Sequence, residues 1–224
     1  MKKLVLFVEG DGDKLAVPVL VKRLITDFGF WDRLQLDPDP FMVCGVDAVL
    51  GSNQKIERWL RLLRAANKRQ SVGGILQVLD GDSPALCAWK DAARLAERAK
   101  EIGAGTTFSL ACVFACREYE TWLLAAIESL AGRERSDGRE GVRAGAVKPE
   151  GDLELAPRDA KRKLGELMIA GYKPMKDQAA LTQLVDLNVL RGSELRSFKR
   201  LETALRQLAL AIQTGEHVST PTSS

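Results

Sequence analysis

Short apolar segments alternate with amphipathic ones along the first half of the chain, and this alternation constrains the fold more than any other feature. Residues 3–8, 74–79 and 107–115 are largely apolar runs that are too short for core helices. Strands without a polar face are typical of a parallel sheet covered by helices on both faces. The intervening segments 14–28 and 53–68 carry helical periodicity. The sequence therefore predicts an α/β fold.

The predicted sheet has about four parallel strands, with residues 41–45 as a weaker candidate. Residues 1–131 are expected to form the α/β domain. Residues 132–156 are rich in Gly, Arg, Glu and Asp and are expected to be a linker or flexible loop. Residues 157–216 are expected to be an all-helical C-terminal part, and the polar residues 217–224 a disordered tail. Further helices are predicted at 83–102, from 120 onward, and at 158–170, 177–190 and 194–214.

Composition narrows the possible chemistry. The 224 residues include 33 basic and 30 acidic ones, so the formal net charge of +3 implies no partner by itself. The single histidine, His217, lies near the polar C-terminus. Sites of the Ser-His-Asp and Cys-His classes and histidine zinc sites are therefore disfavoured. Chemistry is expected to rest on carboxylates, Lys, Arg or Cys.

No apolar run approaches the roughly 18 residues of a membrane helix. The first residues also do not resemble a signal peptide, because Glu9 follows only six mostly apolar residues. The cytoplasm is therefore the expected location, without a membrane partner. The cysteines form no Cys-x-x-Cys pair, and they are expected to be reduced core thiols: Cys44, Cys87, Cys112 and Cys116. The tryptophans on apolar helical faces are also expected in the core: Trp59, Trp89 and Trp122.

Acidic residues follow three of the predicted strands. They are Glu9 with Asp11 and Asp13, then Asp80 and Asp82, then Glu118 and Glu120. The carboxyl ends of parallel strands share one edge of a sheet, so these side chains can converge. When carboxylates cluster, either some of them take up protons or a cation compensates their charge, and oxygen ligands suit Mg²⁺ or Mn²⁺. Each cluster alone also fits a solvated turn or the acidic start of a helix. Neither a Walker loop nor a GxGxxG turn follows the first strand.

A basic set in the C-terminal part has the spacing of one helical face: Arg196, Lys199 and Arg200. Such a face can bind phosphates. The alternative is a solvated helix surface with Phe198 in the core. A second basic set is expected to be an ordinary exposed helical face: Arg158, Lys161, Arg162 and Lys163.

The strand followed by Glu9-Gly10, with Asp80-x-Asp82 after a later strand, resembles a Toprim domain. Toprim is the metal-binding catalytic module of topoisomerases, primases and overcoming-lysogenization-defect nucleases. The resemblance implies that Glu9 is a general acid or base, or a ligand, and that Asp80 and Asp82 hold Mg²⁺.

A closer resemblance covers nearly the whole chain. It is to the bacterial domain-of-unknown-function family 4276, which is viewed as Toprim-like, and it rests on residues 8–20, 117–126, 172–174, 177–182 and 196–201. Members of that family are often found near ATPases in anti-phage or mobile-element neighbourhoods. The motifs contain three further residues that are expected to support the site: Asp13, Arg117 and Asp177. Many members carry a longer acidic run after the third strand, whereas Ser83-Pro84 follows here, so the metal number stays open.

The leading hypothesis is a Mg²⁺- or Mn²⁺-dependent nuclease with Glu9, Asp80 and Asp82 as catalytic residues. Glu118 and Glu120 would complete the metal ligands, and the expected partners are nucleic acid and an AAA-type or related ATPase. Hydrolysis is favoured over strand transfer, because no tyrosine is placed as a nucleophile. The first alternative is a non-catalytic partner or regulatory module of an ATPase. The second is a nucleotide phosphatase. The sequence leaves open DNA or RNA, endo- or exonuclease, and oligomeric state.

Overall fold

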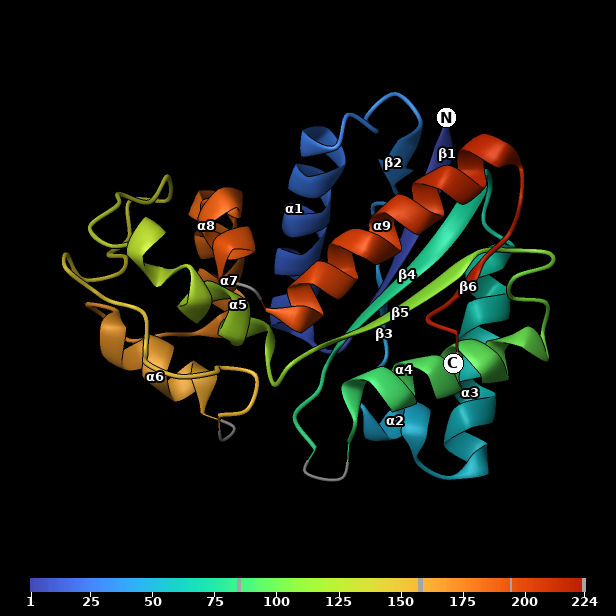
Figure 1. The fold of residues 1–224 in the computed structure, drawn as a ribbon, viewed down its shortest axis with the longest axis horizontal. Helices are drawn as coiled ribbons and strands as arrows, with labels where there is room; N and C mark the ends of the chain where they lie inside the picture. The colour runs from blue at the N-terminus through green and yellow to red at the C-terminus, as the bar shows by residue number, and fades with distance from the viewer. Residues whose placement is uncertain (84–85, 157–158, 194, 223–224) are drawn as a thin grey trace.

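A parallel six-stranded sheet forms the centre of the molecule (Figure 1). The computed structural model describes residues 1–83, 86–156, 159–193 and 195–222. The strands are β1 (Lys2–Val8), β2 (Leu34–Leu36), β3 (Phe41–Met42), β4 (Val72–Asp80), β5 (Leu110–Ala115) and β6 (Ser219–Thr220). Their order is β2-β1-β4-β5-β6, and β3 also pairs with β1. Every pairing is parallel, which confirms the predicted sheet.

Helices cover both faces of this sheet, as the apolar strands predict (Figure 1). One face is covered by α1 (Asp11–Asp27) and α9 (Arg196–Thr214). The other is covered by α2 (Asp47–Leu50), α3 (Asn53–Asn67) and α4 (Ala88–Lys100). Side chains of β1 alternate between the two cores: Leu4, Leu6 and Val8 join the first, and Val5 and Phe7 the second.

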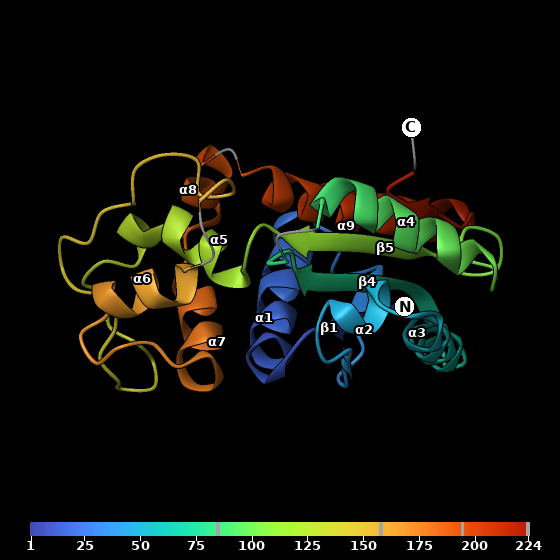
Figure 2. The same ribbon diagram turned by 90° about the horizontal axis from the view of Figure 1, so that it is seen from below.

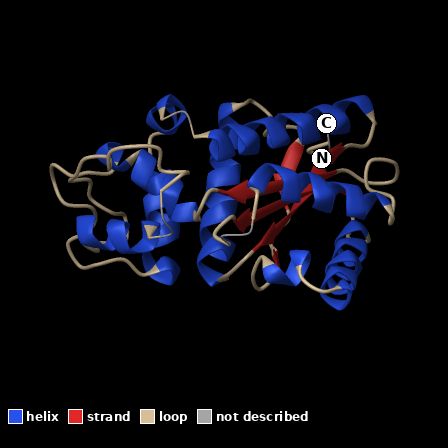
Figure 3. Ribbon diagram, turned by 60° about the horizontal axis from the view of Figure 1, so that its bottom comes forward, coloured by secondary structure: helices blue, strands red, loops and turns tan. Residues whose placement is uncertain are grey.

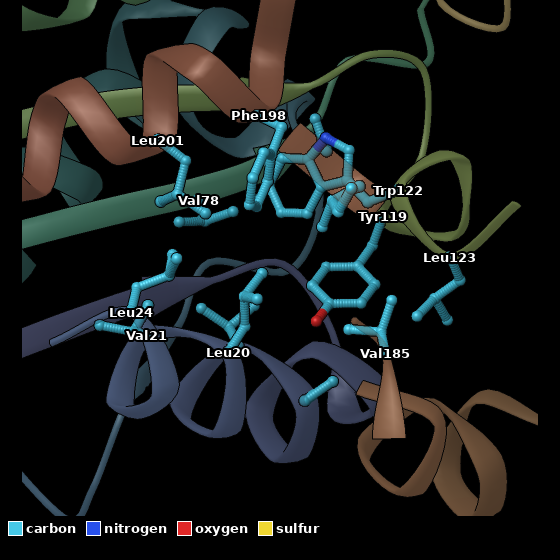
Figure 4. Packing of buried hydrophobic residues seen from close by; sticks show 14 of the residues in the cluster. Leu20, Val21, Leu24, Val78, Tyr119, Trp122, Leu123, Val185, Phe198 and Leu201 are labelled. Carbon is cyan, nitrogen blue, oxygen red and sulfur yellow. The ribbon is translucent and has the colours of Figure 1, made fainter. Parts of the chain in front are cut away.

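The remaining helices gather at the carboxyl end of the sheet (Figure 2 and Figure 3). They are α5 (Tyr119–Ala125), a short 3₁₀ turn (Ile127–Ser129), α6 (Ala160–Leu167), α7 (Pro174–Leu184) and α8 (Leu187–Gly192). Aromatic residues of α5 and α9 connect this group to the sheet. Trp122 packs against Tyr119 and Phe198, and its indole donates a hydrogen bond of 2.8 Å to Ser197 Oγ (Figure 4). The helical C-terminal part is thereby continuous with the core of the α/β part.

Several elements differ from the sequence expectations. The helix predicted over 177–190 is two helices, because Asp186 caps a new one and accepts a hydrogen bond of 2.7 Å from the Asn188 amide. The expectation of a disordered tail over 217–224 is wrong for Ser219 and Thr220, which form β6 and pair with β5. Strand β2 was not predicted. The expected starts of three helices, at Ser83-Pro84, Arg158 and Glu194, involve positions outside the described residues.

The segment 132–156 forms no helix or strand. It is nevertheless anchored, because Arg135, Leu153 and Glu154 are buried. Trp59 and Trp122 are core residues, as expected, whereas Trp89 is 53% exposed. Cys44 and Cys87 are also exposed, so only part of the cysteine expectation holds. Within the described ranges, no helix has the length and apolar character needed to cross a membrane.

Candidate functional site

The predicted acidic residues meet at the carboxyl ends of three adjacent strands. Glu9 follows β1, Asp80 ends β4, and Glu118 lies between β5 and the first turn of α5. Strand β1 lies between β2 and β4. After β1 the chain adds β2 on one side of it, and it later adds β4 on the other side, so the strand order reverses at β1. Ligands of open α/β sheets bind at such a reversal of strand order. We call these strand-end carboxylates, Glu9, Asp80 and Glu118 with Glu120 in the first turn of α5, the acidic edge. It lies where the topology favours a ligand site.

Backbone hydrogen bonds tie these strand ends together. Glu9 Oε2 accepts a bond of 3.0 Å from the Asp80 amide. Asp80 Oδ1 in turn accepts a bond of 2.8 Å from the Tyr119 amide. The Tyr119 side chain points into the core, where its hydroxyl lies 2.8 Å from Thr182 Oγ1. It is therefore not available as a nucleophile, in agreement with the sequence expectation.

A lysine that the sequence reasoning missed lies among the carboxylates. The ammonium nitrogen of Lys161, on α6, is 3.3 Å from Glu118 Oε1, 3.5 Å from Asp80 Oδ2 and 3.9 Å from Glu120 Oε2. The expectation of an ordinary exposed face for Lys161 is thus wrong. The signal for it in the sequence was general: clustered carboxylates are either partly protonated or compensated by a cation.

Glu120 is the most buried acid of the group, with no exposed surface. Its Oε1 accepts a hydrogen bond of 2.8 Å from the Tyr172 hydroxyl. Its Oε2 has no hydrogen-bond partner in the described part of the chain, although the Lys161 ammonium lies 3.9 Å away. Burial raises the pKa of Glu120 to about 7, against the opposing effect of Lys161. This carboxyl group can therefore exchange a proton near neutral pH.

Asp13 joins the site from the first turn of α1. It accepts hydrogen bonds of 2.8 Å from Gln178 Nε2 and 3.2 Å from the Gly10 amide. Gln178 lies in the motif 177–182, but it was not among the candidate site residues predicted from the sequence. Its helix, α7, packs closely on α1 at Gly12, where a Cβ would lie 2.2 Å from Gln178 Oε1 and 2.8 Å from Pro174 Cβ. A glycine at this position therefore permits the contact between the two helices.

Burial is the main electrostatic influence on these acids. It raises the pKa of Asp80 well above its usual range, and the neighbouring Asp13 and Glu120 raise that pKa further. It also raises the pKa values of Glu9 and Asp13. Burial opposes the charge of Lys161, but the surrounding carboxylates outweigh it and raise the pKa of the ammonium group. The cluster thus holds protons readily and keeps its one lysine charged.

The other predicted site residues have different surroundings. Asp82 is half-buried beyond Gly81, and its charge contributes to the raised pKa of Glu9. The Nε of Arg117 donates a bond of 3.0 Å to the Ala156 carbonyl. Asp177 is buried in an ion pair of 2.7 Å with Arg135. Asp177 also accepts the amide of Lys173, so these contacts fix the start of α7.

The predicted basic face does not point in one direction. Arg196 donates bonds of 2.9 Å to Glu154 and 3.2 Å to Asp152. Arg200 instead donates to Gln207 at 3.1 Å and to Thr220 at 2.9 Å. Lys199 is exposed, and Phe198 is in the core. Arg196 and Arg200 line a cavity whose wall also includes Gly81, the residue between Asp80 and Asp82.

Among the described residues, no three Asp, Glu, Cys or His side chains stand close enough together to hold a metal ion as they are arranged. The cation at this position is the Lys161 ammonium, which lies within 4 Å of three carboxylates. All of these donors are oxygens, the ligand type that Mg²⁺ and Mn²⁺ prefer, and Glu120 Oε2 lacks a hydrogen bond within the described residues. As arranged in the structure, the carboxylates contact an ammonium group.

Comparison with known proteins gives one match. The model of a family described as "Domain of unknown function (DUF4276)" matches residues 8–206, which include every carboxylate of the acidic edge and Lys161. No curated protein and no solved structure matches the chain. The matched segment is far more than half of the chain, and the chain therefore belongs to this family of domains of unknown function, DUF4276.

Proposed function

We propose that this protein is a Toprim-like enzyme that hydrolyses phosphodiester bonds of nucleic acid with Mg²⁺ or Mn²⁺. The observation that carries the proposal is a cation, the Lys161 ammonium, held by carboxylates at the ends of β4 and β5, next to Glu9 after β1. An all-oxygen cation site at a reversal of strand order suits a phosphate substrate.

Asp80 and Glu118, with Glu120, Glu9 and Asp82, are the residues that would hold the metal. When bound, the metal ion neutralises charge on the phosphate and lowers the pKa of a water molecule. The protein groups would supply positioning and proton transfer. Glu9 is held against the end of β4 by the Asp80 amide, and it is the candidate base where the other carboxylates hold the metal.

Lys161 would have two roles. Without metal it neutralises the carboxylates, since three of them lie within 4 Å of its ammonium group. If these carboxylates held a divalent cation instead, the ammonium group would be free to contact a phosphate oxygen. Its side chain is 42% exposed, so it can reach the solvent side of the site.

A second candidate function is a non-catalytic module that acts on an ATPase encoded nearby. The same lysine favours it, because Lys161 already balances the acidic edge without a metal. On this alternative the protein forms a stable complex with its ATPase, and no metal supports turnover.

Calorimetry with Mn²⁺ tests the proposal first. Wild type is expected to bind, while Asp80→Asn/Asp82→Asn and Glu9→Gln lose binding and keep their circular dichroism spectra. Glu57→Gln is the matched control, because Glu57 is an exposed carboxylate on α3, outside the acidic edge. Labelled DNA and RNA are then incubated with Mn²⁺, alongside a panel of nucleoside triphosphates. Cleavage retained by Asp80→Asn contradicts the proposal, and triphosphate hydrolysis without strand cleavage indicates a phosphatase instead.

A further inference from the structure

A cavity of about 360 Å³ lies beside the acidic edge, on the other side of the Asp80–Asp82 turn. Its walls come from the segment before α4, the end of β5 and the start of α9. Cavities of several hundred cubic ångströms are typical of small-ligand sites. None of the contacts described at the acidic edge accounts for this cavity.

The cavity is mainly apolar, and an exposed indole lines it. Leu86 and Phe114 form part of its wall, and Trp89 lies in the first turn of α4. The Trp89 side chain is 53% exposed, although most of the apolar side chains of α4 are buried. An aromatic ring with an exposed face beside an apolar cavity suits stacking of a second planar ring.

Positive charge also lines this apolar space. Arg117, Arg196 and Arg200 line the cavity together with one acid, Glu154. Glu154 is buried, and its carboxylate is already engaged by Arg196 at 2.9 Å. The excess of arginines over carboxylates favours an anionic ligand, and a guanidinium group is well matched to phosphate.

Arg117 is the arginine best placed to link the cavity to the acidic edge. Its Nε is fixed by the Ala156 carbonyl at 3.0 Å. Its terminal nitrogens make no hydrogen bond to the described part of the chain, so they remain available to a ligand. The next residue is Glu118, and Gly81 of the cavity wall lies between Asp80 and Asp82. At Arg117 and Gly81 the cavity wall thus continues into the segments that carry the carboxylates.

We propose that this cavity binds a nucleotide, whose base stacks on Trp89 and whose phosphate contacts Arg117. The inference rests on the proposed function and deepens it, since it identifies how the enzyme holds the nucleotide next to the bond that is cleaved. The base comes either from a nucleic acid strand or from a free mononucleotide, and the two share this chemistry.

Binding without metal tests this inference separately from catalysis. Short single-stranded DNA and RNA oligonucleotides, nucleoside monophosphates and the corresponding nucleosides are titrated into the full chain in EDTA. Wild type is expected to bind strands or monophosphates more tightly than nucleosides. Trp89→Ala is expected to weaken this binding roughly 5- to 150-fold, the range for one stacked base. Trp89→Phe is expected to restore part of it, and Arg117→Gln to remove the preference for the phosphate.

Trp31→Ala is the matched control, because Trp31 is 67% exposed and does not line the cavity. It is expected to bind as wild type does. Unchanged binding by Trp89→Ala, or equal binding of nucleosides and nucleotides, overturns the inference. Tight binding of strands but not of monophosphates supports a strand base, and the reverse supports a free nucleotide. If the protein neither binds Mn²⁺ nor cleaves nucleic acid but still binds nucleotides in a Trp89-dependent way, this inference holds and the proposed function is wrong.

Discussion

The ammonium nitrogen of Lys161 lies 3.5 Å from Oδ2 of Asp80, a residue 81 positions earlier in the chain. This contact joins α6 to the end of β4 and places a positive charge where the acidic edge requires one. Replacing Lys161 with Met removes that charge but keeps much of the side-chain length. We expect Mn²⁺ affinity to increase about tenfold, or about 1.4 kcal/mol, because the metal no longer competes with an ammonium group.

Calorimetric titration of Lys161→Met measures this effect, with Lys163→Met as the control. Lys163 is on the same helix, and it pairs with Asp159 at 3.2 Å rather than with the acidic edge. Unchanged or weaker Mn²⁺ binding by Lys161→Met would show that the ammonium group does not compete with the metal for the carboxylates.

Glu120 makes stability depend on pH in an unusual direction. Its pKa is about 7 in the folded protein, raised by burial from an ordinary value of 4.5. Between these values the folded state holds a proton that the unfolded state has lost, so the free energy of unfolding falls as pH rises. The resulting loss in the free energy of unfolding, from below pH 4.5 to above pH 7, is on the order of 3 kcal/mol. Urea unfolding at several pH values between 4.5 and 8, in EDTA, measures it.

Glu120→Gln is expected to reduce that slope and to be more stable than wild type at pH 8. Glu57→Gln, which changes an exposed acid on α3, is expected to leave the slope as it is. The idea fails if Glu120→Gln retains the wild-type slope. Raised pKa values of Asp80, Glu9 and Asp13 act in the same direction, so part of the dependence should persist.

Gly12 is expected to tolerate no side chain. In Gly12→Ala the added Cβ meets Gln178 Oε1 at 2.2 Å and Pro174 Cβ at 2.8 Å, so α1 and α7 must separate. We expect a loss of about 1–3 kcal/mol in unfolding free energy, which is typical of overpacking. Chemical denaturation measures it. Gly192→Ala, on α8, is the control, because a Cβ there meets nothing within 4 Å; equal stability of the two variants would refute the close-packing argument.

The ion pair between Arg135 and Asp177 is buried, with side-chain exposures of 1% and 4%. Arg135→Met is expected to cost about 3–5 kcal/mol, because it removes the main partner of a buried carboxylate. The double variant Arg135→Met/Asp177→Asn should recover part of the loss. A double variant no more stable than Arg135→Met would indicate that the arginine acts through packing alone.

Much of the fold follows from the sequence because its signals are local. The apolar run before Glu9 and the run ending at Leu79 have no polar face, so they had to be buried strands, and chain direction then placed their acids at one edge. Lys161 gave no such signal, since its position depends on how α6 packs against distant strands. Trp89 has the spacing of a core residue, and only the packing of α4 leaves it exposed. Strands β2 and β6 are too short to produce a pattern.

The position of α6 late in the chain has a consequence for biosynthesis. Asp80, Glu118 and Glu120 are all synthesised before Lys161, so a nascent chain carries these carboxylates before it carries the lysine that balances them. Until α6 emerges from the ribosome, these carboxylates must stay in water, take up protons or bind a cation from solution. The charge partner of these strand-end carboxylates is therefore supplied by a later helix that is not part of the sheet.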